Sequence, residues 1–541
     1  MAKLPVIELL LHLVCLLILV SVGSSNGGHL INCLASDREA LMDFKTGLQD
    51  HGNVLSSWRS SNCCEWHGIQ CDNNTGTVVA VDLHNPYWGP NSNSSHEGYV
   101  FRSLSGEIRS SLMNLKLLRH LDLSFNTFNG VPIPEFFGSL ENLQYLNLSH
   151  AGFTSTIPRH LGNLSHLQVL DLGFLELHVD NFQWINGLIS LEYLAMNGVD
   201  LSLLKDWFDV LNQLPSIVEL HLSGCNLPSY IRPLVSLNFC SLAVMDLSFN
   251  NFHSKVPNWL VNTSSLQHID MSESGLYGRI PLDLGDMPNL LWLDLSRTYD
   301  LTASCSQLFR KRWEKIQIIN LKDNKVHGKL PSSLGNMTSL TRLYLDSNAI
   351  EGSIPSSIRE LCNLNRFSSS RNNMTGNLPE ILEGTQTCPF KKPLHNLQYL
   401  VLRDNQLGGK IPYWLGQLEN MIGIDLSHNL FEGPIPTSFG SMKNLNILQL
   451  GKNKFNGTLP ESLGQLSTLS GLDVSSNQLE GIISEIHFSK LTNLIFLDLS
   501  FNSFIVNISS NWMPPFQVEI LMMSSCIVGP SFHLGSNHKK R

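Results

Sequence analysis

Residues 340–358 read LTRLYLDSNAIEGSIPSSI, a stretch whose two halves follow different patterns. The first half fits L-x-x-L-x-L-x-x-N, in which Leu343 and Leu345 alternate with polar neighbours. A period of two predicts a short strand that buries one face and turns the other outward. In the second half, Gly352 permits a turn and Pro355 stops further strand pairing. A short helical turn is expected next, on the outer side of the unit.

This unit recurs along most of the chain, almost without loss of phase. Successive members are 24 to 26 residues apart, except for one step of 40 and one of 33. Repetition of this kind predicts an α/β solenoid, a leucine-rich-repeat superhelix of about 18 coils with a parallel concave sheet. The central apolar positions are Val81, Leu121, Leu146, Leu170, Leu194, Leu220, Met245, Ile269, Leu293, Ile319, Leu343, Phe367, Leu400, Ile424, Leu448, Leu472, Leu497 and Leu521.

Polar side chains follow the strands at fixed offsets. Ten coils place an asparagine such as Asn348 where its amide can satisfy backbone groups of the turn, whereas Ala151, Leu175 and Val199 cannot do so. We therefore expect the coils from residue 146 to 199 to be the least regular. Aspartates between the paired apolar residues, such as Asp122, suggest either cation binding or a solvated stripe, and we favour the solvated stripe.

Bulk composition narrows the function. The formal net charge of -9 argues against a nucleic-acid partner, which requires a field of Lys and Arg. The apolar run from Leu9 to Val22 is short for a membrane span, so residues 1–25 are predicted to be a signal peptide that directs the chain to the secretory pathway.

In the oxidising secretory pathway, cysteines can form disulfides and sequons can carry glycans. Ten cysteines lie outside the signal peptide and predict a disulfide framework, with Cys362 and Cys388 placed for a local bridge. The pairing of Cys225, Cys240, Cys305 and Cys526 is left open. Nine Asn-x-Ser/Thr sequons favour a glycoprotein, at Asn73, Asn93, Asn147, Asn163, Asn262, Asn336, Asn373, Asn456 and Asn507.

The motifs that flank the repeats point to a family. Residues 37–45 read DREALMDFK, residues 55–58 LSSW, and residues 63–71 CCEWHGIQC; FSKL at 488–491 leads into NWMPPFQV at 511–518. With these motifs the chain resembles the extracellular part of plant leucine-rich-repeat receptor-like proteins. Within that family it most resembles the receptors for the fungal ethylene-inducing xylanase. The resemblance implies disulfides Cys33–Cys63 and Cys64–Cys71, although four cysteines alone allow three pairings.

The resemblance also implies a domain order. Residues 26–77 form the amino-terminal cap and residues 78–532 the repeats, with insertions at 85–102 and 380–394. The tail at 533–541 departs from the family pattern, which continues in relatives into a membrane helix. We interpret the departure as a C-terminal truncation, so plasma-membrane anchoring belongs to full-length relatives and the chain as given is extracellular.

No catalytic motif accompanies the repeats: H-E-x-x-H, G-x-S-x-G and the P-loop pattern are all missing, and the histidines lack metal-ligand spacing. The sequence therefore predicts a binding protein without catalytic activity, cofactor or metal. Arg and aromatic residues, which favour protein interfaces, gather at outward strand positions. They define a predicted ligand surface of Trp292, Arg297, Lys322, Arg342, Tyr344, Arg366, Arg371, Tyr399 and Arg403, the alternative being an ordinary solvated face.

The function predicted on this basis is recognition in plant immunity. A microbial protein or fragment, or an acidic glycan, would bind the concave face, and signalling would pass through a partner or adaptor kinase. Two other functions remain open: a secreted inhibitor of a microbial cell-wall-degrading enzyme, and the ectodomain of a developmental peptide receptor.

Overall fold

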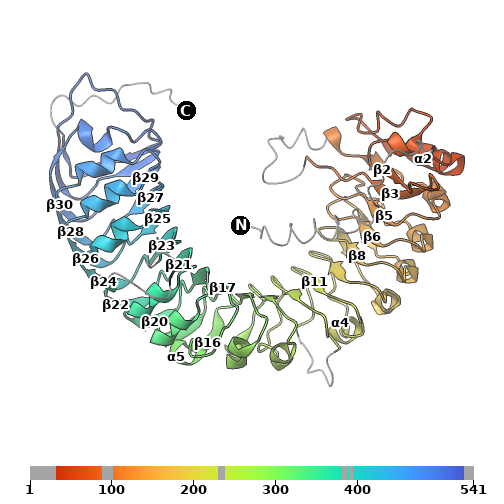
Figure 1. Ribbon diagram of the computed structural model, residues 1–541, viewed down its shortest axis with the longest axis horizontal. Coiled ribbons are helices and arrows are strands. Elements are labelled where there is room, and N and C mark those ends of the chain that lie inside the picture. Colours follow the sequence, from red (N-terminus) through yellow and green to blue (C-terminus); the bar gives the residue numbers. More distant parts are fainter. Residues whose placement is uncertain (1–31, 88–100, 230–237, 381–387, 389–393, 529–541) are drawn as a thin grey trace. The chain divides into compact units, whose positions relative to one another are not determined.

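The computed structural model describes residues 32–87, 101–229, 238–380, 388 and 394–528 (Figure 1). The predicted signal peptide, the sequon at Asn93, the tail at 533–541 and most of both insertions lie outside these residues. The chain divides into two compact units. The amino-terminal unit comprises residues 1–228 and 238–240, and the carboxyl-terminal unit comprises residues 229–237 and 241–541.

A disulfide-bonded cap begins the described chain. It contains helix α2 (Ala35–Gly47), the short turn η1 (Cys63–Glu65) and strand β1 (Leu48–Gln49), which pairs antiparallel with β4 (Ser105–Gly106). The buried carboxylate of Asp37 in α2 accepts a 2.8 Å hydrogen bond from the backbone of Val78 and so ties the cap to the first repeat. The cap covers the apolar end of the first coil, which a solenoid requires.

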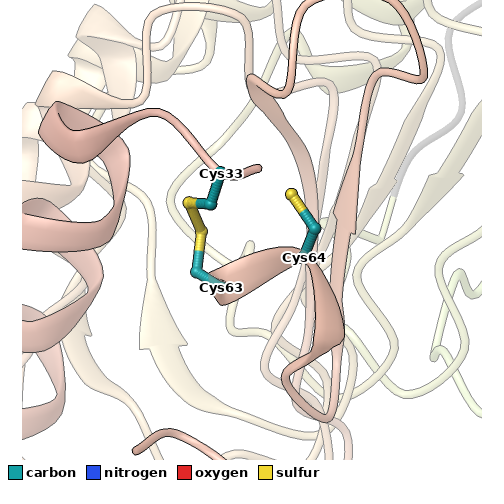
Figure 2. A group of neighbouring side chains, drawn as sticks. All are labelled: Cys33, Cys63 and Cys64. Carbon is teal, nitrogen blue, oxygen red and sulfur yellow. A yellow bond between two sulfur atoms is a disulfide. The ribbon is translucent and has the colours of Figure 1, made fainter. Parts of the chain in front are cut away.

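The cap cysteines form the two predicted pairs, Cys33–Cys63 and Cys64–Cys71. Figure 2 shows the first of them, with Cys64 beside it on the same turn. The sulfur atoms of Cys33, Cys63 and Cys64 lie within 4.8 Å of one another, a spacing that suits a metal ion. Because all three are consumed in disulfides, none is available as a thiolate ligand.

The inner sheet of the amino-terminal unit is built from the first strand of each repeat. Strand β2 pairs antiparallel with β3, and the later strands follow β3 in parallel, with the predicted central residues Val81, Leu121 and Leu146 directly opposite one another. The strands are β2 (Ile69–Cys71), β3 (Val78–Asp82), β5 (His120–Asp122), β6 (Tyr145–Asn147), β8 (Val169–Asp171), β10 (Tyr193–Ala195) and β11 (Glu219–His221).

In the carboxyl-terminal unit the same register continues over a longer parallel ladder, as with Leu343 opposite Phe367. Both side chains are almost fully buried, as the period-two pattern predicts. The strands are β12 (Val244–Asp246), β13 (His268–Asp270), β15 (Trp292–Asp294), β17 (Ile318–Asn320), β19 (Arg342–Tyr344), β21 (Arg366–Ser368), β23 (Tyr399–Val401), β25 (Gly423–Asp425), β27 (Ile447–Gln449), β29 (Gly471–Asp473), β31 (Phe496–Asp498) and β33 (Ile520–Met522).

A second, outer parallel sheet lies on the other side of the carboxyl-terminal unit, whose inner strands line the concave side in Figure 1. Its strands end near the predicted turn glycines, and Gly352 has a φ of 75°. The strands are β14 (Tyr277–Arg279), β16 (Asp300–Ser304), β18 (Lys325–Lys329), β20 (Ala349–Gly352), β22 (Asn373–Asn377), β24 (Gln406–Gly409), β26 (Leu430–Gly433), β28 (Lys454–Gly457), β30 (Gln478–Ile483), β32 (Ser503–Val506) and β34 (Ile527–Val528).

Short helical turns follow the outer segments, as the sequence predicts. Many begin after a proline, such as Pro355 before η9. In the amino-terminal unit they are η2 (Ser110–Asn114), η3 (Glu135–Ser139), η4 (Arg159–Asn163), η5 (Gln183–Gly187) and α4 (Trp207–Leu211). In the carboxyl-terminal unit they are η6 (Asn258–Asn262), η7 (Leu282–Asp286), α5 (Cys305–Leu308), η8 (Ser332–Asn336), η9 (Ser356–Glu360), η11 (Tyr413–Gln417), η12 (Thr437–Ser441), η13 (Glu461–Gln465) and η14 (Glu485–Phe488).

Inward asparagines join consecutive coils. The amide of Asn348 donates to the carbonyl oxygens of Leu321 and Leu345 at 2.9 and 3.1 Å, and its Oδ1 accepts from the backbone of Val326 at 2.8 Å. Each such side chain therefore satisfies buried backbone groups of its own coil and of the coil before it.

Coils that lack this asparagine were expected to be irregular, and for the inner sheet that expectation is wrong. Strands β6, β8 and β10 keep the common register, although the offset is filled by the buried apolar residues Ala151, Leu175 and Val199. In these three strands, backbone pairing keeps the common register without the inward asparagine. The outer layer is shorter in this region, where only β7 (Thr154–Thr156) and β9 (Glu176–His178) pair as strands among the described residues.

Candidate ligand-binding surface

The nine predicted surface residues all lie in the carboxyl-terminal unit, on or just after strands of the inner sheet. Arg297 and Arg371 are exposed, whereas the other seven are half-buried. The prediction placed all nine at exposed positions, and the difference arises because neighbouring strands carry large side chains that cover one another. Four of them, Arg342, Tyr344, Arg366 and Tyr399, occupy the three adjacent strands β19, β21 and β23.

Arg366 is the centre of this group. Its guanidinium lies 5.5 Å from the ring centroid of Tyr344 and 4.7 Å from that of Tyr399, so it is held between two aromatic faces. Tyr399 in turn lies over Gly423, where an added Cβ would come within 2.9 Å of its Cδ1. The missing side chain at position 423 therefore leaves space for the ring that positions Arg366.

Ion pairs already engage three of the predicted cations, two of which share one carboxylate. Arg297 contacts Glu273 at 2.6 Å, Arg403 contacts Asp404 at 3.2 Å, and Arg371 lies 3.8 Å from the same Asp404. A cation whose charge is already balanced gains little from a new carboxylate. These three side chains are weak candidates for direct ligand binding.

The other three cations keep their charge available. Across the described part of the chain, no carboxylate lies within 4.0 Å of the cationic group of Lys322, Arg342 or Arg366. The Nε of Arg366 is buried without a hydrogen-bond partner. Arg342 and Arg366 are directly opposite each other on adjacent strands, about 4.8 Å apart in the hydrogen-bonding direction. The pair is therefore suited to an anionic group of a ligand.

Trp292 and Arg297 lie further along the inner sheet. The Trp292 ring stacks on His268, with centroids 5.0 Å apart, and strand β17 separates β15 from the Arg342–Tyr399 group. The structure thus divides the predicted surface into a compact core on β19, β21 and β23 and a separate aromatic pair on β13 and β15.

The prediction of a solvated stripe is wrong for two aspartates of the inner sheet, while the others of the stripe are half-buried. Asp122 and Asp294 are buried, and each accepts hydrogen bonds from the backbone and hydroxyl of the serine two residues later, at 2.6 to 2.9 Å. Burial raises the pKa of Asp171 to about 6. Burial and the charges of Asp294 and Asp246 raise the pKa of Asp270 to about 7.

Glycosylation remains a proposal, but the structure places eight of the nine sequon asparagines. Seven are exposed: Asn73, Asn163, Asn262, Asn336, Asn373, Asn456 and Asn507. Asn147 differs, because it is half-buried in β6 on the inner sheet. Its amide donates to Asp122 and Tyr145, both at 3.3 Å.

Three family models match this architecture. The leucine rich repeat N-terminal domain matches residues 34–72, and the leucine-rich repeat region matches residues 101–315. Single leucine rich repeats match 339–361, 396–418, 420–442 and 444–466. The chain belongs to the leucine-rich-repeat proteins. All three matched models describe leucine-rich repeats or their amino-terminal domain, and none of them describes a catalytic domain.

Two tomato proteins are similar to this leucine-rich-repeat chain over most of its length. Receptor-like protein EIX1 of Solanum lycopersicum is 35% identical over 94% of the chain, and Receptor-like protein EIX2 is 35% identical over 92%. The chain covers 49% and 48% of these relatives, about half of their length. Among the described residues, no helix has the length and apolar character needed to cross a membrane.

Solved receptor ectodomains share the fold of this leucine-rich-repeat chain. The Arabidopsis receptor kinase HAESA, in complex with the peptide hormone IDA and the co-receptor SERK1, superimposes with a TM-score of 0.71 at 26% identity. That comparison covers 92% of this chain and 90% of the HAESA chain. The ectodomain of GASSHO1/SCHENGEN3 from Arabidopsis thaliana gives a TM-score of 0.62 at 26% identity, covering 91% and 64%.

Proposed function

We propose that this chain is the ligand-binding extracellular region of a plant receptor-like protein that recognises a microbial protein or protein fragment. Similarity to the two tomato receptor-like proteins supports the receptor class. The observation that carries the binding proposal is Arg366, which is held between Tyr344 and Tyr399 and has no carboxylate of the described residues within 4.0 Å of its guanidinium.

The chemistry of this group selects an acidic ligand. A guanidinium that is partly buried has lost water, and a carboxylate can replace that water with two parallel hydrogen bonds. Arg342 on the next strand provides a second positive charge, and the tyrosines provide apolar area beside both. An acidic loop with an adjacent aromatic or aliphatic side chain fits this surface.

Signalling and location are part of the same proposal. The chain enters the secretory pathway, carries N-glycans at the exposed sequons, and acts outside the cell. Signalling passes through a partner kinase or co-receptor. Support comes from HAESA, whose solved complex includes the co-receptor SERK1.

The experiment is a binding measurement on the glycosylated protein, secreted from plant cells, with a fungal ethylene-inducing xylanase as the probe. The double charge reversal Arg342→Glu and Arg366→Glu should weaken binding by at least about 30-fold, which corresponds to the loss of 2 kcal/mol or more at a charged contact. Biolayer interferometry gives the dissociation constants.

Arg310→Glu is the control for a charge reversal outside the inner sheet, because Arg310 is exposed and follows the outer turn α5. It should leave the affinity within about twofold. Equal affinities for the wild type and the inner-sheet double variant would refute the ligand surface. If the xylanase does not bind the wild-type protein at all, this ligand assignment fails.

A second candidate is the ectodomain of a receptor for an endogenous peptide. The TM-score of 0.71 to HAESA with its bound peptide hormone favours it. Competition separates the two functions: an acidic plant peptide that binds the wild type, and loses affinity in the same double variant, would identify the peptide receptor.

A further inference from the structure

A cluster of titratable groups lies in the amino-terminal unit, on different coils from the ligand surface. Strand β3 ends at Asp82, β5 ends at Asp122, and the two aspartates are directly opposite each other in the inner sheet. His84 follows β3 by two residues, and its Nδ1 lies 2.6 Å from Oδ1 of Asp82. Residues separated by 38 to 40 positions in the chain thus meet at one edge of two strands.

The three side chains have the spacing of metal ligands. One carboxylate oxygen of each aspartate and one ring nitrogen of His84 all lie within 4.8 Å of one another. Metal–ligand bonds of about 2.0 to 2.2 Å place neighbouring ligand atoms about 3 to 4 Å apart. Small rotations of the Asp82 and His84 side chains, which are 39% and 46% exposed, are sufficient to reach that spacing.

Asp122 is held in place by its neighbours. It is buried, its Oδ1 accepts from the backbone and hydroxyl of Ser124 at 2.9 and 2.6 Å, and its Oδ2 accepts from Tyr145 at 3.2 Å and Asn147 at 3.3 Å. Hydrogen bonds of this kind orient the ligands of established metal sites. A buried carboxylate beside a second carboxylate is also repelled by it, unless a cation lies between them.

A second imidazole adds to the same chemistry. His120 begins β5, stacks on the Tyr145 ring with centroids 4.2 Å apart, and is close enough to Asp82, His84 and Asp122 to interact with their charges. Imidazole nitrogens favour zinc and its neighbours in the first transition series, whereas calcium takes six to eight oxygen ligands.

We propose that Asp82, His84 and Asp122 form a binding site for a transition-metal dication of the Zn²⁺ class, with His120 beside it. The bound ion joins β3 to β5, the first two parallel strands after the cap. The site supplies no residue to the Arg342–Tyr399 group and does not depend on the proposed function.

Isothermal titration of the secreted, EDTA-stripped protein with Zn²⁺ tests the site. The wild type should give a saturable one-to-one isotherm that excess Ca²⁺ does not abolish. His84→Ala and Asp122→Asn should each weaken Zn²⁺ binding by about 100-fold or more. Tyr145→Phe removes the hydroxyl that donates to Asp122 and accepts from Asn147, and it should weaken Zn²⁺ binding by about 10-fold, the size of effect expected for a group that orients a ligand.

His160→Ala is the matched control, because this histidine has a similar exposed fraction of 47% and lies 3.8 Å from Glu135 in the same unit. It should bind Zn²⁺ with wild-type affinity. Circular dichroism of each variant checks the fold, and the exposed His84 variant keeps the test valid if Asp122→Asn does not fold. Lack of saturable binding by the wild type, or unchanged affinity after His84→Ala, would overturn the proposal.

Discussion

The residue before each inward asparagine position adopts a left-handed backbone conformation. In the carboxyl-terminal unit this holds for all twelve coils from β12 to β33, and Ser347, with a φ of 53°, is a typical example. None of these twelve residues is glycine. Because Cβ crowds the following carbonyl oxygen there, each such residue costs about 1 kcal/mol. The strain persists because the turn has to direct the next side chain, such as Asn348, into the core.

Glycine at one of these positions should therefore stabilise the protein. Ser347→Gly is expected to raise the free energy of unfolding by roughly 0.5 to 1 kcal/mol, whereas Ser347→Val should lower it, because a β-branched residue tolerates positive φ poorly. Urea denaturation followed by circular dichroism measures both. Ser332→Gly in η8, where the backbone is helical, is the control and should destabilise.

Asp270 should make stability depend on pH. Its pKa of about 7 in the folded protein lies above the unfolded value of 3.8, so the native state binds the proton more tightly. The destabilisation is fully present above pH 7 and disappears as the pH falls toward 4. Asp270→Asn keeps an acceptor for Ser272 and should raise the free energy of unfolding at pH 7.5 by roughly 1 to 3 kcal/mol, with little change at pH 4.

Thermal unfolding at pH 4, 5.5 and 7.5 measures this effect. Asp300→Asn is the control, because Asp300 is exposed at the start of the outer strand β16. A gain of the same size at all three pH values would contradict the assignment.

The alternation of apolar and polar residues along the strands did not predict the burial of the inner-sheet aspartates. A polar residue between two inward leucines should face solvent, yet Asp122 and Asp294 are buried. In a parallel stack each aspartate lies between identical positions of the neighbouring coils, and the serine two residues later folds back onto it. The approach of His84 to Asp122 depends in the same way on coil stacking, which spacing along the chain does not reveal.

At the scale of single elements, the repeat period predicted every parallel strand of the inner sheet among the described residues, but not the antiparallel strand β2 of the cap. All eighteen predicted central residues, from Val81 to Leu521, lie in inner-sheet strands, and all except Val81 are the middle residue of a three-residue strand. The register follows because shifting a strand by one residue would expose its leucines. The outer sheet was less evident, since its strands are short and most of them contain glycine, a residue that usually weakens strands.

The bridge between Cys362 and Cys388 belongs to this scale, because it fastens the segment between β22 and β23 to the turn after η9. It closes a loop with a sequence separation of 26, so the double variant Cys362→Ser, Cys388→Ser should lose about 3 kcal/mol. Hydrogen exchange should accelerate in β22 and β23 and stay unchanged in β29, since repeats contact mainly their neighbours. Uniform acceleration across all three strands would refute a local role.

Across the whole molecule, the sequence did not predict which cations of the proposed ligand surface are engaged in ion pairs. Arg297 and Arg366 are the same residue type in the same repeat motif. Glu273 from the neighbouring coil pairs with Arg297, whereas no described carboxylate pairs with Arg366. Such pairings join residues about one repeat apart, and they become visible only when the coils are stacked. The Asp82–Asp122 cluster lies in the amino-terminal unit, and the Arg342–Tyr399 group lies in the carboxyl-terminal unit.

Glycan positions provide the last test at this scale. Asn163, Asn262 and Asn336 end helical turns of the outer layer, where a glycan meets only solvent. A glycan on Asn147 would instead replace an amide proton bonded to Asp122 or Tyr145 and would cover the inner sheet. We therefore expect glycopeptide mapping of the secreted protein to find the three outer sites occupied and Asn147 unmodified. Full occupancy at Asn147 would show that the amino-terminal inner face tolerates a bulky group, and it would contradict the hydrogen-bonded arrangement around Asp122.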